Sequence, residues 1–118
     1  MPVRLVVPST GRVIARNLRR AATPRERARG LLRGPPLGAG EALVLEPARQ
    51  VHTFGMRHPV DVCFCDRAWR VLHVVTPLRP RRVTRWVFRA RFAIEMRPGG
   101  LAGLQEGDQL SVEELNDR

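Results

Sequence analysis

Short apolar runs separated by turn-forming residues mark most of the chain. Each run holds four to six residues, many of them β-branched, and glycine, proline or aspartate interrupts the pattern at intervals of roughly ten residues. The predicted strands are Val3–Val7, Arg12–Ala15, Ala42–Leu45, Val60–Cys65, Val71–Val75, Thr84–Phe88, Phe92–Met96 and Gln109–Val112. Strands this short and this evenly spaced are typical of a β-sandwich or a small β-barrel.

One segment departs from this pattern and predicts a helix. Thr23-Pro24-Arg25-Glu26 is a capping box, in which the threonine hydroxyl accepts from the Glu26 amide and Glu26 reaches back to the Thr23 amide. The predicted helix covers Arg25–Leu32 and ends before a Gly-Pro-Pro sequence. Gly30 lies inside this helix, where glycine costs about 1 kcal/mol relative to alanine. Its position there predicts close packing against the sheet or a ligand.

The length of 118 residues fits a single domain, and the 43% share of hydrophobic residues excludes a disordered chain. We therefore expect a mainly β, single-domain sandwich or barrel-like fold with one short α-helix. The domain spans residues 1–118, with a core at 12–112 and a loose acidic tail at 113–118.

The sequence also predicts the compartment. No apolar run approaches the roughly 20 residues of a membrane-spanning helix, and Met1–Leu18 lacks the apolar stretch of a signal peptide. Two cysteines do not form a disulfide scaffold. These features predict a cytoplasmic protein without a membrane span.

Charge is distributed unevenly along the chain. Every basic residue is an arginine, and residues 1–91 hold 19 arginines against 5 acidic residues, whereas residues 92–118 hold 2 against 6. Such a basic stretch attracts phosphates, acidic lipid headgroups or acidic proteins at low salt. The partner it indicates is an acidic protein or another polyanion. The alternative interpretation is a solvated arginine surface without a specific partner.

The basic residues are densest at 79–91, where six arginines alternate with two aromatic residues and several apolar ones. These arginines are Arg79, Arg81, Arg82, Arg85, Arg89 and Arg91. One interpretation is a basic strand edge that stacks on nucleic-acid bases or binds phosphates. The other is an exposed strand whose arginines prevent edge-to-edge aggregation.

A second group of polar residues lies in the middle of the chain. The candidate ligand-binding residues are His52, Thr53, Met56, Arg57, His58 and Asp61. In one interpretation they converge on an anionic or polar ligand, and in the other they form a polar network that fixes a loop to the sandwich. Asp61 lies between two valines, so it needs a partner if it is buried. Arg57, His52 or backbone amides are the expected donors.

The sequence Cys63-Phe64-Cys65 is a weak candidate for a metal site. If Asp66 pairs with Arg70 across the hairpin turn, Cys63 lies opposite His73 and Cys65 opposite Val71. With a fourth ligand from His52 or His58, these residues would make a zinc site. Both faces of the hairpin are apolar, however, which is typical of buried structural cysteines. We therefore predict no bound metal and no cofactor.

Three short motifs resemble a known family of small bacterial and archaeal proteins, domain of unknown function 192. They are Ala28-Arg29-Gly30-Leu31, Phe54-Gly55-Met56 through Pro59-Val60-Asp61, and Gly103-Leu104-Gln105-Glu106-Gly107-Asp108. The resemblance covers roughly Arg12–Val112 and implies a compact β-sandwich-like fold and no known activity. The chain departs from the family at Gly55, Arg57-His58 and Trp69, where relatives often have Trp, Lys-Asn and Gly.

The sequence contains no enzyme signature. A glycine-rich phosphate loop, a Gly-x-Ser-x-Gly elbow and a His-Glu-x-x-His motif are all absent. We therefore expect a non-enzymatic binding or accessory module with a polar site around residues 52–61. The alternative is phosphate or nucleic-acid binding through residues 79–91, and a metal-assisted enzyme is the least favoured interpretation.

Overall fold

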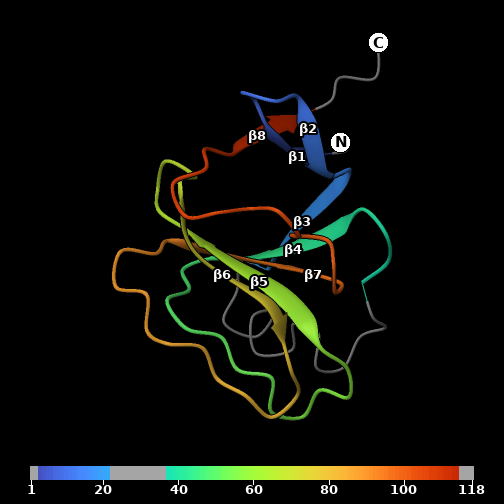
Figure 1. The fold of residues 1–118 in the computed structure, drawn as a ribbon, viewed down its shortest axis with the longest axis vertical. Coiled ribbons are helices and arrows are strands. Elements are labelled where there is room, and N and C mark those ends of the chain that lie inside the picture. The colour runs from blue at the N-terminus through green and yellow to red at the C-terminus, as the bar shows by residue number, and fades with distance from the viewer. Residues whose placement is uncertain (1–2, 22–36, 115–118) are drawn as a thin grey trace.

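The computed structural model describes residues 3–21 and 37–114, in which eight strands form two sheets (Figure 1). The strands are β1 (Val3–Val7), β2 (Arg12–Ala15), β3 (Asn17–Ala21), β4 (Glu41–Leu45), β5 (Val60–Cys65), β6 (Val71–Leu78), β7 (Phe92–Met96) and β8 (Ser111–Glu114). The mainly β fold is confirmed. The predicted helix at 25–32, with its cap Thr23 and Gly30, lies outside the described residues.

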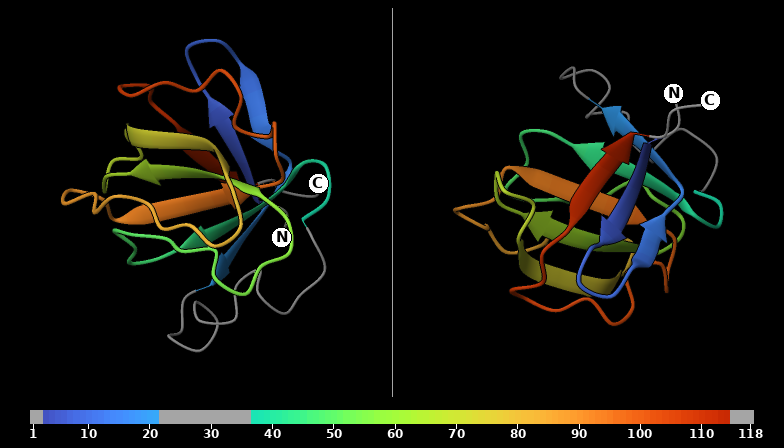
Figure 2. Two further views of the ribbon diagram at one scale, coloured as in Figure 1. Left: turned by 60° about the horizontal axis from the view of Figure 1, so that its bottom comes forward. Right: turned by 90° about the horizontal axis from the view of Figure 1, so that it is seen from above.

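The smaller sheet has the order β2-β1-β8 and the larger one the order β3-β4-β7-β5-β6. Strands β3 and β4 are parallel, and the other pairs are antiparallel. Figure 2 shows the smaller sheet stacked across one face of the larger one. The arrangement is a sandwich of unequal layers.

The first hydrophobic core lies between the two sheets. Leu5 and Ile14 of the smaller sheet belong to one buried cluster with Val44, Cys63 and Ile94 of the larger sheet. The central strands β5 and β7 are buried over their whole length. Because both of their faces are covered, their sequences are continuous apolar runs rather than alternating ones.

The second hydrophobic core lies on the opposite face of the larger sheet. Here Phe64 and Ala93 of the sheet cluster with Val51, Met56 and Val87, which belong to long connections rather than to strands. The connection between β4 and β5 and the one between β6 and β7 therefore take the place of a third layer. This layer is where both candidate regions of the sequence lie.

Prediction and structure differ at three main places: the C-terminal segment, strand β3 and residues 84–88. Residues 109–112 were expected as the last strand, but β8 covers Ser111–Glu114, and Glu113 pairs its carboxylate with Arg4 at 2.8 Å. The acidic tail is therefore not loose at 113 and 114, because these residues pair with β1. Strand β3 was not predicted, since only Leu18 and Ala21 of its five residues are buried. The third correction, at 84–88, concerns the candidate site.

No helix in the described residues is long and apolar enough to cross a membrane.

Candidate binding surface

The segment 79–91 is irregular, and the strand predicted at Thr84–Phe88 is wrong. Thr84, Val87 and Ala90 are buried, and the two residues between one buried position and the next are exposed. A strand would bury every second residue, so a period of three excludes one. Hydrogen bonds follow the same spacing, because the Thr84 amide donates to Val51 and the Val87 amide to Arg49.

This spacing exposes two neighbouring pairs of residues, each with one arginine and one aromatic side chain. They are Arg85-Trp86 and Phe88-Arg89, which we call the Arg–aromatic face. Trp86 is 56% exposed and Phe88 79% exposed. Burial of large aromatic side chains is normally favourable, so their exposure is not explained by the packing of the fold.

A shallow groove of about 340 Å³ adjoins the Arg–aromatic face. Arg49, Arg67, Arg89 and Arg91 line it together with Phe88, and we call it the arginine groove. The one carboxylate in its lining, Asp66, accepts from the backbone amides of Ala68 and Arg70 at 2.8 and 3.0 Å. These bonds hold the turn between β5 and β6, so the groove remains a predominantly cationic site.

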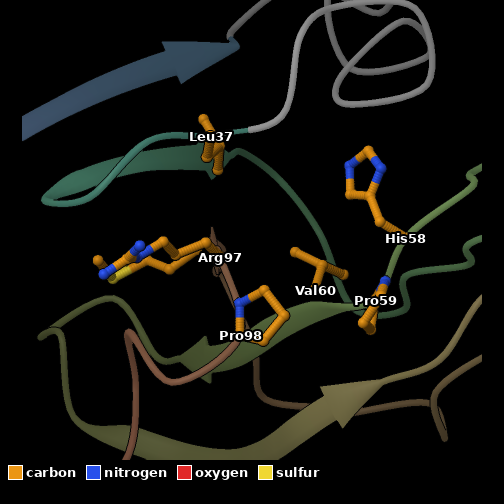
Figure 3. Close-up of a pocket in the computed structure, with 7 residues that line it drawn as sticks. Leu37, His58, Pro59, Val60, Arg97 and Pro98 are labelled. Atoms are coloured by element: carbon orange, nitrogen blue, oxygen red, sulfur yellow. The ribbon is translucent and has the colours of Figure 1, made fainter.

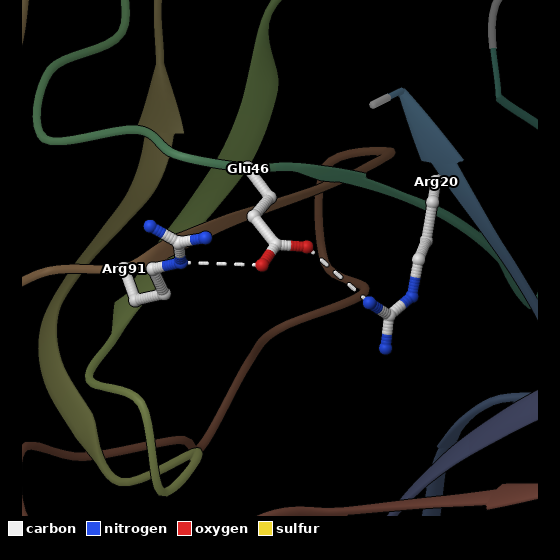
Figure 4. Close-up of polar contacts among 3 residues, drawn as sticks. All are labelled: Arg20, Glu46 and Arg91. Atoms are coloured by element: carbon white, nitrogen blue, oxygen red, sulfur yellow. Dashed lines mark hydrogen bonds and ion pairs between the residues drawn. The ribbon is translucent and has the colours of Figure 1, made fainter. Parts of the chain in front are cut away.

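Two of these arginines have partners among the described residues: the Nε of Arg49 donates to the Phe88 carbonyl at 3.0 Å, and Arg91 forms an ion pair. The Nε of Arg91 lies 3.2 Å from one oxygen of Glu46, and the other oxygen of Glu46 lies 3.3 Å from Arg20 (Figure 4). The Arg20 guanidinium also lies over the Trp69 ring, 5.8 Å from its centroid. Glu46 thus partly neutralises Arg91, while Arg85 and Arg89 form no ion pair with any described carboxylate.

The first half of the predicted 52–61 site packs against the backbone of the arginine-rich segment. The hydroxyl of the fully buried Thr53 donates to the Arg79 carbonyl and accepts from the Arg82 amide at 3.0 Å. His52 forms an isolated bridge with Val83, and its exposed ring lies 5.6 Å from that of Phe54. The two candidate regions of the sequence are therefore joined through Thr53 and His52.

The second half of the predicted site lies elsewhere. Met56 is buried in the second core, Arg57 is exposed, and His58 lines a separate apolar cavity. Asp61, only 1% exposed, accepts from the amides of Gly99 and Leu101 at 2.9 and 3.1 Å. The prediction that donors accompany this carboxylate is confirmed, and they are backbone amides rather than Arg57 or His52.

The structure does not bring Cys63 and Cys65 together with His73, as the predicted pairing of the hairpin required. Cys65 pairs with Val71 as expected, but Cys63 pairs with Val74 and His73 with Phe64. The register shifts between Phe64 and Cys65, which leaves Leu72 as an extra residue in β6. Beside this bulge, Val71 also bonds to residues 107 and 108 in the connection between β7 and β8. Cys63 and Cys65 belong to the first core, whereas Phe64, the partner of His73, belongs to the second.

The two thiols contact each other instead. Their sulfur atoms lie 3.9 Å apart, and both residues are buried. The hydrogen bond between the two thiols, together with burial, raises the pKa of the Cys65 thiol. A raised pKa makes a thiol a poor nucleophile and a poor metal ligand. No cluster of three residues suited to a metal ion occurs within residues 3–21 and 37–114.

The structure also reveals a buried carboxyl group that sequence reasoning did not single out. Glu95 lies at the centre of the larger sheet, between Leu43 and Val62 on the neighbouring strands. Burial raises the pKa of its carboxyl group to about 7. The signal in the sequence was a single acidic residue inside the apolar run Phe92–Met96.

Two solved structures share this fold. One is a protein of unknown function from Novosphingobium aromaticivorans DSM 12444, with 23% identity, a TM-score of 0.77 and coverage of 94% of this chain and 84% of that one. The other, named as a candidate transcription regulator of Sinorhizobium meliloti 1021, has 18% identity, a TM-score of 0.73 and coverage of 93% and 91%. Identities this low show the shared fold alone. No curated protein matches the sequence significantly.

The backbone conformation accounts for the glycines at the motif positions. Gly55, Gly103 and Gly107 all have positive φ angles, between 87° and 94°, a conformation that side chains disfavour. Trp69, where relatives often have glycine, has a φ of 64° and is held there by stacking on Phe92, with ring centroids 3.9 Å apart.

The family profile named domain of unknown function 192, described as an uncharacterized ACR, matches residues 5–112. The chain belongs to this uncharacterised family.

Proposed function

We propose that the protein is a non-enzymatic binding module that binds single-stranded nucleic acid through the Arg–aromatic face and the arginine groove. The observation that carries this proposal is the repeated exposure of an arginine beside an aromatic ring, at Arg85-Trp86 and again at Phe88-Arg89. Single-stranded nucleic acids are bound by this combination of stacking platforms and cations, without a need for a base-specific hydrogen-bond code.

Each component of the surface has a separate task in this proposal. The rings of Trp86 and Phe88 stack on successive bases, because every base offers an aromatic face whatever its sequence. Arg49, Arg67 and Arg89 in the groove, together with Arg85 beside Trp86, bind the phosphates that accompany those bases. The surface reads shape and charge rather than sequence, so the proposed binding has low sequence specificity.

Trp86 itself reports binding. The chain has two tryptophans, and Trp69 is stacked on Phe92, so the exposed Trp86 is the ring that a ligand reaches first. We expect titration with oligothymidylate of about ten nucleotides to quench the tryptophan fluorescence. The affinity should fall with salt, with a slope of about −3 in log K against log salt if four arginines contact phosphates.

Three variants separate stacking from charge. Trp86→Ala should weaken binding at least tenfold, since one base–aromatic stack contributes about 1–3 kcal/mol. Arg85→Ala should reduce the salt slope by about 0.7. The matched control is Arg12→Ala, an exposed arginine of β2 on the smaller sheet, which should leave both values unchanged.

Two outcomes would contradict the proposal. Equal loss of affinity in Arg85→Ala and Arg12→Ala would mean diffuse attraction to the basic surface. Unchanged affinity in Trp86→Ala, with a loss confined to Arg85→Ala, would mean a phosphate site without stacking. In that second case the partner is a polyanion of another class, such as inorganic polyphosphate or an acidic protein.

A further inference from the structure

A second concave site lies apart from the Arg–aromatic face, at the ends of β5 and β7. It is a cavity of about 250 Å³ with an apolar lining from three separate segments of the chain (Figure 3). Leu37, Pro59, Val60 and Pro98 provide the apolar surface, and His58 and Arg97 lie at its margins. No carboxylate is among the described residues that line it.

His58 is the lining residue that offers this cavity a polar recognition element. Its Nε2 atom is buried and has no hydrogen-bond partner among the described residues. A buried nitrogen without a partner costs free energy, and a ligand oxygen would remove that cost once the ring turns its Nε2 toward the cavity. Arg97 is exposed at another part of the rim and belongs to none of the ion pairs within residues 3–21 and 37–114.

The wall of the cavity is held in place by Asp61. Its buried carboxylate accepts from the amides of Gly99 and Leu101, directly after the lining residues Arg97 and Pro98. Gly100 is fixed by packing, since a Cβ atom there would lie 2.8 Å from the Met96 Cβ. This wall of the cavity is therefore formed before a ligand arrives, which lowers the cost of binding.

We propose that this cavity binds a small apolar carboxylate. The carboxylate accepts a hydrogen bond from His58 in the positive field of Arg97, and the hydrocarbon part lies against Leu37, Val60 and Pro98. A volume of about 250 Å³ lies at the small end for ligand sites and favours a small ligand. A medium-chain or small aromatic acid meets these conditions, whereas a dicarboxylate or a nucleotide is too polar or too large. This inference is independent of nucleic-acid binding.

The test compares three probes on the intact protein at equal millimolar concentrations, with the melting temperature Tm as the readout. Hexanoate should raise Tm by a few degrees in a concentration-dependent manner. Acetate lacks the hydrocarbon part and should leave Tm unchanged, and hexan-1-ol lacks the charge and should bind at least tenfold more weakly. His58→Ala should weaken hexanoate binding at least tenfold, and the control His52→Ala should not.

Nuclear magnetic resonance provides a readout that does not depend on a variant. Addition of hexanoate to the wild-type protein should shift the imidazole signals of His58 and leave those of His73 in place. No Tm shift with hexanoate, or equal affinities for hexanoate and hexan-1-ol, would overturn the proposal. So would an unshifted His58 signal at saturating hexanoate.

Discussion

Strand β5 and the segment 79–91 contribute to the same hydrophobic core by opposite means. All six residues of β5 are buried, with Val62 and Phe64 in the second core and Cys63 and Cys65 in the first. The segment 79–91 contributes only Val87 and Ala90 to that core. In β5 every side chain is buried, whereas the segment buries only its anchor positions.

This difference shows which positions of the fold can change in sequence without loss of stability. A residue in β5 has neighbours on both faces of the sheet, so its size is fixed by packing density. Between the anchors of the segment, the residues contact solvent and can be chosen for binding without loss of stability. The predictions below test this division, in order of decreasing effect on the free energy of unfolding.

Phe64→Ala should produce the largest loss. Phe64 is fully buried at the centre of the larger sheet, and its truncation should reduce the free energy of unfolding by about 3–5 kcal/mol. Urea unfolding followed by circular dichroism measures this loss. A cost below about 1 kcal/mol would show that β5 is no more constrained than the exposed segment.

Glu95 should make stability depend on pH in an unusual direction. Its folded-state pKa of about 7 lies above the ordinary 4.5, so the native state keeps a proton that the unfolded state has lost between these values. Stability should therefore fall by roughly 3 kcal/mol as pH rises from about 4.5 to about 7 and then level off. Glu95→Gln should remove this fall.

The pH comparison isolates Glu95 from other titrating groups. Burial and Arg85 lower the pKa of His73, which gives an opposite slope in wild type and variant alike. The difference in urea midpoints between wild type and Glu95→Gln, measured at pH 5 and pH 8, cancels that contribution. A difference that does not change with pH would contradict the raised pKa.

Thr84→Val tests an anchor of the segment. The Thr84 hydroxyl accepts from the Val51 amide and donates to the Arg85 carbonyl, each at 3.0 Å. Valine keeps the shape and leaves the buried amide without this partner, so the free energy of unfolding should drop by about 1–3 kcal/mol. A neutral result in urea unfolding would mean that the segment is held by its other contacts.

Trp86→Ala and Phe88→Ala should have the smallest effect on stability. Both rings are largely exposed, so each substitution should change the free energy of unfolding by no more than about 0.5 kcal/mol. The same urea experiment measures both variants. A loss above about 1 kcal/mol in either would place its ring among the residues the fold requires, and the division between the two regions would fail.

The strands that were predicted correctly are those whose burial is visible in their own sequence. Phe92–Met96 and Val60–Cys65 are apolar runs of strand length because they are buried on both faces. Strand β3 was not predicted because it lies at a sheet edge, where only two residues of its Asn17-Leu18-Arg19-Arg20-Ala21 sequence are buried. The register of β6 was not predicted either, because its extra residue lies beside Val71, which bonds to a loop more than 30 residues away in the sequence.

The candidate site was predictable in part. The arginines of 79–91 were identified, but their partners Arg49 and Arg67 come from other loops and only the tertiary fold brings them together. The β-branched and aromatic content of Thr84–Phe88 indicated a strand. A different signal was present in the sequence, since Thr84, Val87 and Ala90 recur at intervals of three among arginines and aromatics.

The three-residue period of this segment also determines which length changes it tolerates. Val87 and Ala90 are successive anchors with two exposed residues between them. An insertion of three residues keeps every later anchor in phase and adds one more exposed pair, whereas an insertion of one or two turns the anchors outward. Relatives of this chain should therefore vary in loop length here by multiples of three, and each added triplet would extend the exposed surface by one unit.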